Sequence, residues 1–346
     1  MLLLGAALLA GGCADMGAEV TLPQPAPAPA GGGEVRTLAP PRSAPTGLGE
    51  LRLEDQRVAD VAYRLATRNA GLCADLAPQT GLVLQSALEY SPRLRPAAEA
   101  YFHIDDRPAV EAVAEGSPAA DAGLQAGDIL LSVDGATFES AQTVGGDVRP
   151  ASYAPMARAL GAIDAGLARG GAHVVVLRGA ARREVLLVGR TGCAYDAEVL
   201  PGEALNASAD GRHVFITTAL VRYAATPDAL ALVLGHEFAH DLLHHQARLD
   251  RAGLNRRALG ELGSTPASLR LAEREADYVG LYLTARAGYG VADAPAFVRD
   301  FPGAWADALQ WSHPDAADRA AGLAAARDEI ARRQAAGEPL TPTPAG

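Results

Sequence analysis

Residues 233–245 read VLGHEFAHDLLHH, and this stretch decides how the chain is interpreted. It contains the pattern His236-Glu237-x-x-His240. A random arrangement of the same residues would produce this pattern about 0.01 times per chain, so chance is a poor explanation. On a helix, His236 and His240 stand one turn apart on one face, where two imidazoles can bind one tetrahedral zinc ion. Glu237 lies beside them and is the candidate catalytic base.

Two short segments predict where helices begin near this pattern. Residues 226–228 (Thr-Pro-Asp) combine a capping residue, a proline at the first helical position and an acid in the first turn. We therefore expect the helix with the histidines to begin there. Residues 265–266 (Thr-Pro) predict the start of a second helix, which extends to about Gly288.

This second helix offers a third metal ligand. Glu273 and Asp277 lie one turn apart on one face. We expect Glu273 to bind the metal and Asp277 to accept the free N–H of a ligand histidine. Glu275 is about 200° away around the helix and cannot share the site. The alternative is an ordinary solvated charge cluster, the usual interpretation of Glu-Arg-Glu.

Together these motifs resemble the HtpX/BepA-like zinc metallopeptidases, relatives of the CAAX prenyl endopeptidase. The resemblance covers about residues 195–330 and rests on residues 205–240, on Glu273-x-x-x-Asp277 and on Ser-His-Pro at 312–314. It implies an α+β fold of the zincin (gluzincin) type, one Zn²⁺ per chain and extended polypeptide substrates. The strand HVFITTAL (213–220) would be the sheet edge along which a substrate lies.

The resemblance also assigns roles to further histidines. His313 corresponds to the family's His-Pro histidine and would stabilise the transition state or occupy the open metal position. A helix cap before Pro314 is the alternative. His244 is two turns from His236, too far to bind the same ion. His245 has a family counterpart that we expect to be structural.

An earlier segment resembles the PDZ domain of bacterial envelope proteases, a β-sandwich or barrel. Residues 116–135 (GSPAADAGLQAGDILLSVDG) carry this resemblance. Within them, Ser117 can cap a short helix that Gly123 ends, and a strand spans residues 129–133. PDZ domains bind extended peptides as an added strand. However, residues 101–108 (YFHIDDRP) precede the strand expected first, where the family has a glycine-rich carboxylate loop, so binding of a free C-terminus is not implied. A structural spacer is the alternative.

The N-terminus resembles a bacterial lipoprotein signal. The apolar run before Cys13 is shorter than the ~20 residues of a membrane span, and small residues precede the cysteine. We expect Cys13 to be lipidated, which places the protein in the bacterial periplasm, anchored to the inner or outer membrane. A cleaved signal with an incidental cysteine is the alternative. The Pro/Ala/Gly-rich segment that follows predicts a flexible tether.

Two further cysteines, Cys73 and Cys193, flank the PDZ-like segment. In an oxidising periplasm an even pair is expected to form a disulfide, and buried free thiols are the alternative. The bridge would join the entry and exit of the PDZ-like domain.

The whole chain is thus expected to contain several units. They are a signal peptide (1–13), a linker (14–48), a helical segment packing on the protease (49–100), a PDZ-like domain (101–190), a metallopeptidase domain (191–337) and a disordered tail (338–346).

Two functions remain open at this point. The first is a zinc endopeptidase that cleaves unfolded or misassembled envelope proteins. The second is a lipid-anchored PDZ adaptor or chaperone with an inactive metal site. The intact ligand set favours the enzyme. A formal net charge of -11 gives no support to nucleic-acid binding, which needs a basic face.

Overall fold

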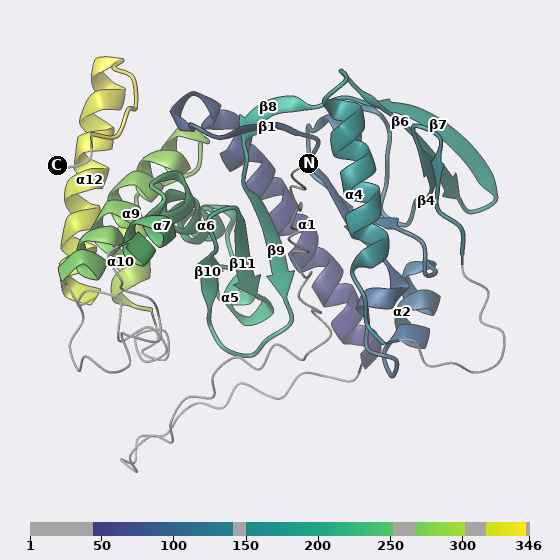
Figure 1. Ribbon diagram of the computed structural model, residues 1–346. Helices are drawn as coiled ribbons and strands as arrows, with labels where there is room; N and C mark the ends of the chain where they lie inside the picture. Colours follow the sequence, from purple (N-terminus) through teal and green to yellow (C-terminus); the bar gives the residue numbers. More distant parts are fainter. Residues whose placement is uncertain (1–43, 141–149, 252–266, 302–315, 344–346) are drawn as a thin grey trace, which may run out of the picture.

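The computed structural model describes residues 44–140, 150–251, 267–301 and 316–343. Helices and a small sheet form one part of the molecule, and a larger sheet with helix α4 forms the other (Figure 1). The long helix α1 (Ala44–Arg68) lies between them. The predicted α+β class is confirmed. None of the helices in these ranges is long and apolar enough to cross a membrane.

The C-terminal part contains a three-stranded sheet and the helices that pack near it. The strands are β9 (Asp196–Leu200), β10 (Ala207–Ala209) and β11 (His213–Thr217). The helices are α5 (Thr218–Tyr223), α6 (Pro227–Leu242), α7 (His245–Arg251), α9 (Ala267–Arg286), α10 (Ala294–Arg299) and α12 (Ala316–Ala336).

The strand order of this sheet corrects one expectation. The order is β10-β11-β9, with β10 antiparallel and β9 parallel to β11. The segment 213–220 is therefore not an edge strand, because both hydrogen-bonding sides of β11 are already paired. Its last residues, from Thr218 onward, belong to helix α5. Among the strands that the structure describes, β9 and β10 are the edge strands of this sheet.

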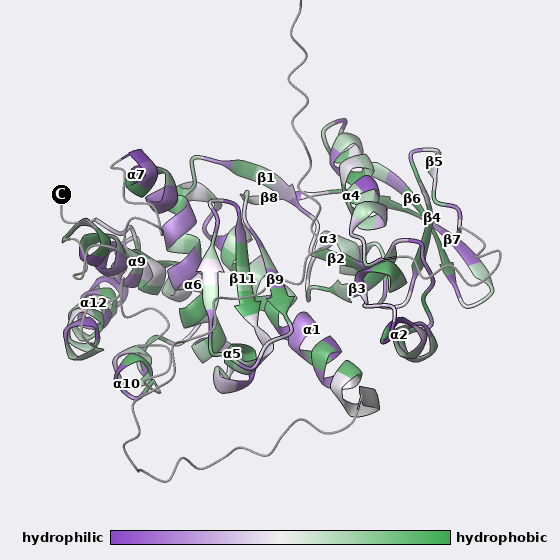
Figure 2. Cartoon of the chain, turned by 60° about the horizontal axis from the view of Figure 1, so that its bottom comes forward, coloured by the Kyte–Doolittle hydropathy of each residue, from purple (hydrophilic) through white to green (hydrophobic). Residues whose placement is uncertain are grey.

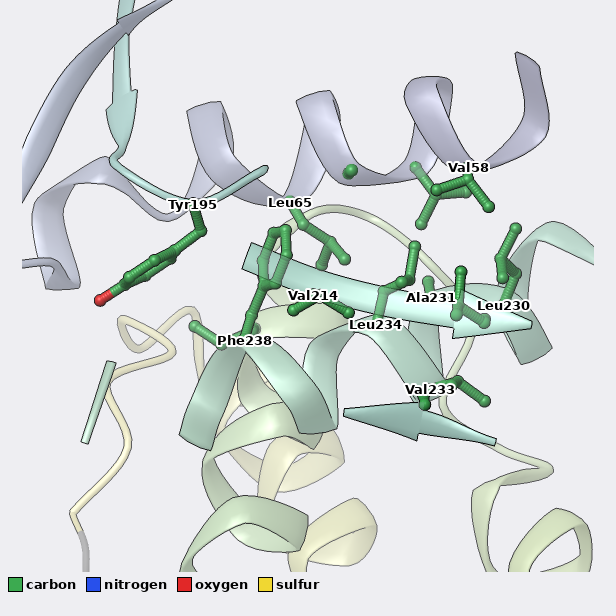
Figure 3. Close-up of a cluster of buried hydrophobic side chains, with 14 of the residues drawn as sticks. Val58, Leu65, Tyr195, Val214, Leu230, Ala231, Val233, Leu234 and Phe238 are labelled. Atoms are coloured by element: carbon green, nitrogen blue, oxygen red, sulfur yellow. The ribbon is translucent and has the colours of Figure 1, made fainter. Parts of the chain in front are cut away.

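The core of this part joins α1 to α6 and β11. Val58 and Leu65 of α1 point toward Leu234 and Phe238 of α6, with Val214 of β11 among them (Figure 3). All five side chains are almost fully buried. Burial of this apolar surface holds α1 on the C-terminal part and stabilises the fold by about 25 cal/mol per Å² removed from water.

The other part is built on a six-stranded sheet (Figure 2). Its strands are β2 (Leu82–Gln85), β3 (Ala109–Val113), β4 (Ile129–Val133), β5 (Ala136–Thr137), β6 (Ala172–Arg178) and β7 (Ala181–Leu187). Its helices are α2 (Arg95–Phe102), α3 (Pro118–Asp121) and α4 (Ala154–Leu167). The order is β2-β3-β4-β6-β7, with β5 paired to β4.

The local turn chemistry of this part agrees with the sequence. The Ser117 side chain accepts a hydrogen bond from Ala120 N at 3.2 Å and caps α3. Gly123 follows with φ +79°, a conformation that favours glycine.

The start of the sheet differs from the expectation. β2 pairs with β3, so the sheet begins before residue 101, where its boundary was placed. Segment 49–100 is accordingly not helical throughout. Residues 101–102 end α2, and residues 103–108 connect α2 to β3. The first strand of the sheet is β2, which directly follows Gly81.

Two short strands and a disulfide lie where the parts meet. β1 (Leu76–Gln79) pairs with β8 (Arg190–Cys193), and a short 3-10 turn, η1 (Ala70–Leu72), precedes β1. A second 3-10 turn, η2 (Ala87–Glu89), lies instead against α2. Cys73 and Cys193 form the expected disulfide, with Cα atoms 5.5 Å apart.

Polar side chains of α1 bind the backbone of β3. Arg52 donates to Glu111 O, Gln56 exchanges hydrogen bonds with Val113 at 2.8 and 3.4 Å, and Asp60 accepts from Glu115 N at 2.8 Å. The three helix residues are four positions apart, which is about 6 Å along a helix. Their partners are two positions apart, which is about 6.6 Å along a strand. The similar spacing lets each side chain reach one partner. β4 pairs with β3 only at Ala109, and α1 therefore supplies partners that a neighbouring strand would otherwise provide.

Some predicted features lie outside the described residues. They are the signal peptide with Cys13, nearly all of the linker, the helix start at 265–266, His313, and the last residues of the tail.

Candidate metal centre

Helix α6 carries the His-Glu-x-x-His pattern and begins at the predicted place. The Thr226 side chain accepts a hydrogen bond from Ala229 N at 3.1 Å, and Pro227 is the first helical residue. His236 and Glu237 are both 6 % exposed, so the pattern lies inside the molecule rather than on a solvated face.

A contact between two glycines brings α6 next to α9. A Cβ on Gly280 would lie 2.8 Å from Gly235 O and 2.8 Å from His236 Cα, closer than real Cβ contacts allow. Thr284, one turn further along α9, donates to Ala231 O at 3.0 Å. The two helix backbones therefore touch beside His236, and this places the carboxylates of α9 opposite the histidines.

Three donor groups converge on one point. Nε2 of His236 lies 3.1 Å from Nε2 of His240. Oxygens of Glu273 lie 3.3 Å from the first nitrogen and 3.5 Å from the second. A tetrahedral zinc ion with bonds of about 2.0–2.2 Å separates its ligand atoms by about 3.3–3.6 Å. Two imidazoles and a carboxylate in this geometry fit a divalent metal ion, and among the described residues this is the one such group.

Asp277 and Arg319 support the first of these histidines. His236 Nδ1 lies 3.0 Å from Asp277 Oδ1, and Arg319 donates to both oxygens of Asp277 at 2.6 and 2.8 Å. Burial favours the neutral carboxyl, but Arg319 and His236 hold the pKa of Asp277 well below its usual range. Burial also opposes charge on His236, yet its hydrogen bonds to Asp277 and Glu273 raise its pKa to about 10. These carboxylates thus attract positive charge to the position that a metal would occupy.

His240 has a different partner. Its Nδ1 lies 2.9 Å from Nδ1 of His245, the first residue of α7. His245 Nε2 lies 3.0 Å from Glu275 Oε2, which also accepts from Arg248 at 2.7 Å. Burial and the neighbouring His240 lower the pKa of His245 to about 4, so its ring is neutral near pH 7.

Two family models match the chain. Residues 182–262 match Peptidase family M48, and residues 109–149 match the PDZ domain. The chain carries an M48 peptidase domain preceded by a PDZ domain. M48 is a family of metallopeptidases, and its match includes the His-Glu-x-x-His pattern. Neither the comparison with curated proteins nor the one with solved structures found a match.

The structure brings most of the expected residues together. His236, His240 and Glu273 surround one point, Glu237 adjoins them on α6, and Asp277 contacts His236. Glu275 stays outside the ligand set, as its position on the helix requires. His244 is half exposed and lies 3.9 Å from Asp75, away from the centre.

Three residues that contact this site were not predicted to do so from the sequence. Arg319 lies 42 residues after its partner Asp277, and no local pattern marks it. Gly280 could have been noticed as a glycine in a helix interior, which usually signals close packing. His245 was expected to be structural, and its contact with His240 was not predicted. That contact forms because α7 folds back toward α9.

Proposed function

We propose that this chain is a zinc-dependent endopeptidase of the bacterial cell envelope. One observation carries the proposal: two imidazole nitrogens and a carboxylate lie 3.1–3.5 Å apart around one point, with Glu237 on the same helix. Zinc is the metal that this ligand set most often binds with a position left open for substrate.

The chemistry assigns Glu237 the proton transfer. A zinc ion held by His236, His240 and Glu273 would lower the pKa of a bound water to about 7 and polarise the substrate carbonyl. Glu237, on the same helix as the two histidines, would accept a proton from the water that attacks the peptide carbonyl carbon. Glu237 would then give this proton to the leaving amine when the C–N bond breaks.

An extended substrate would pair with the free edge of β10. This strand lies at the side of the sheet opposite β9 and packs near α6. Backbone hydrogen bonds to such an edge recognise extended chain without a fixed sequence. Unfolded or misassembled envelope proteins offer this kind of chain. A peptide ligand of the PDZ domain would add to its own edge strand, β2.

Zinc content and casein cleavage test the proposal when both are measured on the same samples. We expect one zinc ion per chain in the wild type and in Glu237→Gln, and cleavage by the wild type alone. His236→Ala and Glu273→Ala should lose zinc and activity together. Substantial activity in Glu237→Gln would contradict the mechanism. Zinc bound without cleavage by either protein would favour the adaptor function.

The proposed location in the bacterial cell envelope rests on the lipoprotein-like N-terminus. We expect labelled fatty acid to be incorporated into the wild type, and Cys13→Ala to abolish both the label and membrane fractionation. A Cys13→Ala protein that stays in the membrane fraction would exclude this anchor.

A further inference from the structure

His245 has a relation to the metal centre that the proposed mechanism does not use. Ligand histidines usually donate their second ring N–H to a carboxylate or a backbone carbonyl. His236 does so with Asp277. His240 instead faces another imidazole, with the two Nδ1 atoms 2.9 Å apart and the rings nearly perpendicular at 74°.

The proton positions in this contact follow by elimination. Only one of two nitrogens in hydrogen-bond contact can carry the shared proton. If Nε2 of His240 binds a metal as a neutral imidazole, its Nδ1 must carry a proton and donate it. Nδ1 of His245 must then be the acceptor. His245 consequently carries its own proton on Nε2, which faces Glu275 Oε2 at 3.0 Å.

Glu275, at the end of this series of hydrogen bonds, is held in place. Glu275 accepts a hydrogen bond from Arg248 Nη1 at 2.7 Å, and the Glu275 side chain is 14 % exposed. The His245 side chain is 2 % exposed, so water does not compete for its ring nitrogens. The arrangement resembles the one at His236, where Asp277 of α9 contacts the ring and is paired with Arg319. At His240 the α9 carboxylate is Glu275, which acts through His245 and is paired with Arg248.

We propose that His245, held by Glu275, is a positioning residue that sets the tautomer and ring orientation of His240 for metal binding. The proposal rests on the proposed zinc site. It assigns a role to both carboxylates of α9 that do not bind the metal themselves. It also explains how Glu275 contributes to the site from the opposite side of the helix.

Two substitutions of His245 separate positioning from packing. An asparagine oxygen can occupy the place of the histidine Nδ1 and accept the same hydrogen bond, whereas leucine fills space without an acceptor. We expect His245→Leu to weaken zinc binding by about 10–100-fold in competition with a chromophoric chelator. His245→Asn should recover most of that loss. His244→Asn is the matched control, since it changes the neighbouring exposed histidine and should leave affinity unchanged.

A purely structural His245 predicts a different result. Both His245 variants would then lose stability to a similar degree, and neither would differ from the other in zinc affinity. Equal affinity in His245→Leu and His245→Asn, or wild-type affinity in His245→Leu, would therefore overturn the proposal. Melting temperatures of the metal-free proteins monitor folding. If His245→Leu does not fold, Glu275→Gln gives the second comparison, and unchanged zinc affinity there would equally overturn it.

The ring protons can be observed without reference to activity. Histidine-labelled protein, studied by two-bond ¹H–¹⁵N correlation NMR, should show His245 protonated on Nε2 and His240 protonated on Nδ1 once zinc is added. A wild type that binds no zinc contradicts the proposed function. A wild type that binds zinc with His245 protonated on Nδ1 contradicts only the positioning role.

Discussion

Arg319 donates two hydrogen bonds to Asp277, to Oδ1 at 2.6 Å and to Oδ2 at 2.8 Å, and both side chains are buried. The same Oδ1 faces the Nδ1 of His236. Helix α12 therefore contributes to the candidate metal centre without supplying one of its three ligands. The guanidinium keeps Asp277 ionised and limits it to one orientation, and this in turn orients a metal ligand.

Loss of Arg319 should weaken the site more than loss of a surface arginine. In Arg319→Leu the Asp277 carboxylate remains buried without its cation, which typically costs about 3–5 kcal/mol of folding free energy. We also expect zinc affinity to fall by about 10–100-fold, as for Asp277→Asn. Chelator competition and denaturant unfolding measure the two effects. Arg327→Leu, which breaks an exposed pair with Asp328, is the control and should change neither. Unchanged zinc affinity in Arg319→Leu would show that Asp277 needs no support.

The glycine contact between α6 and α9 makes a second prediction. Gly280→Ala should separate the helices, since the new methyl would meet the backbone of Gly235 and His236 at 2.8 Å. We expect destabilisation of about 1–3 kcal/mol and weaker zinc binding, because Glu273 moves with α9. Gly322→Ala in α12 has no atom within 4 Å and should instead stabilise its helix by up to about 1 kcal/mol. Thermal unfolding with and without zinc distinguishes these outcomes, and equal behaviour of the two variants would refute the packing argument.

The polar contacts between α1 and β3 should hold the PDZ sheet against the peptidase part. Gln56→Ala removes both hydrogen bonds to Val113 and should cost about 1–3 kcal/mol. Amide hydrogen exchange at Val113 and Glu115 should accelerate in this variant. Gln56 also donates to Asp60, four residues later, at 2.9 Å. Gln246→Ala is a suitable control, because Gln246 donates to Asp250 with the same spacing and distance but lies on the surface. Unaltered protection at both amides would mean that these contacts do not hold β3.

A carboxyl pair at the same junction predicts a pH effect. Burial and the neighbouring Glu111 carboxyl raise the pKa of Asp55 above its usual value, while Arg52 opposes the shift. The folded state therefore favours the protonated form of Asp55. The resulting stabilisation is fully present below the pKa of Asp55 in the unfolded chain, near 4. It is lost as the pH rises through the pKa in the folded state. Asp55→Asn should therefore gain melting temperature relative to the wild type at pH 8–9 and not at pH 4. Melting curves across this range test it, and a constant difference between the proteins would disprove the titration.

The disulfide should contribute to stability through the unfolded state. Cys73 and Cys193 are 120 residues apart, and closing so long a loop stabilises a fold by at most about 4–5 kcal/mol. The double variant Cys73→Ser/Cys193→Ser should unfold at lower denaturant concentration than the oxidised wild type. Reduction of the wild type should reproduce the effect. Peptide mapping of non-reduced protein that finds both cysteines alkylated as free thiols would exclude the bridge.

Local chemistry determined much of this protein from its sequence alone. The cap at Thr226, the short helix after Ser117 and the left-handed Gly123 depend on neighbouring residues, and each lies where its pattern predicts. The spacing of His236 and His240 places them on one face of any helix that includes them. Glu273 and Asp277 share a face for the same reason, and Glu275 cannot join them.

Tertiary structure decided what these faces meet. β11 is central rather than an edge because β9 and β10 both pair with it, and strand order depends on the whole sheet. Arg319 supports Asp277 and His245 supports His240 only because α12 and α7 fold back onto the α6–α9 pair. Such partners lie far apart in the chain or on separate helices, and no helical or strand period relates them. Sequence periodicity specifies the direction of a side chain within its own element, whereas contacts between elements arise from packing of the complete core.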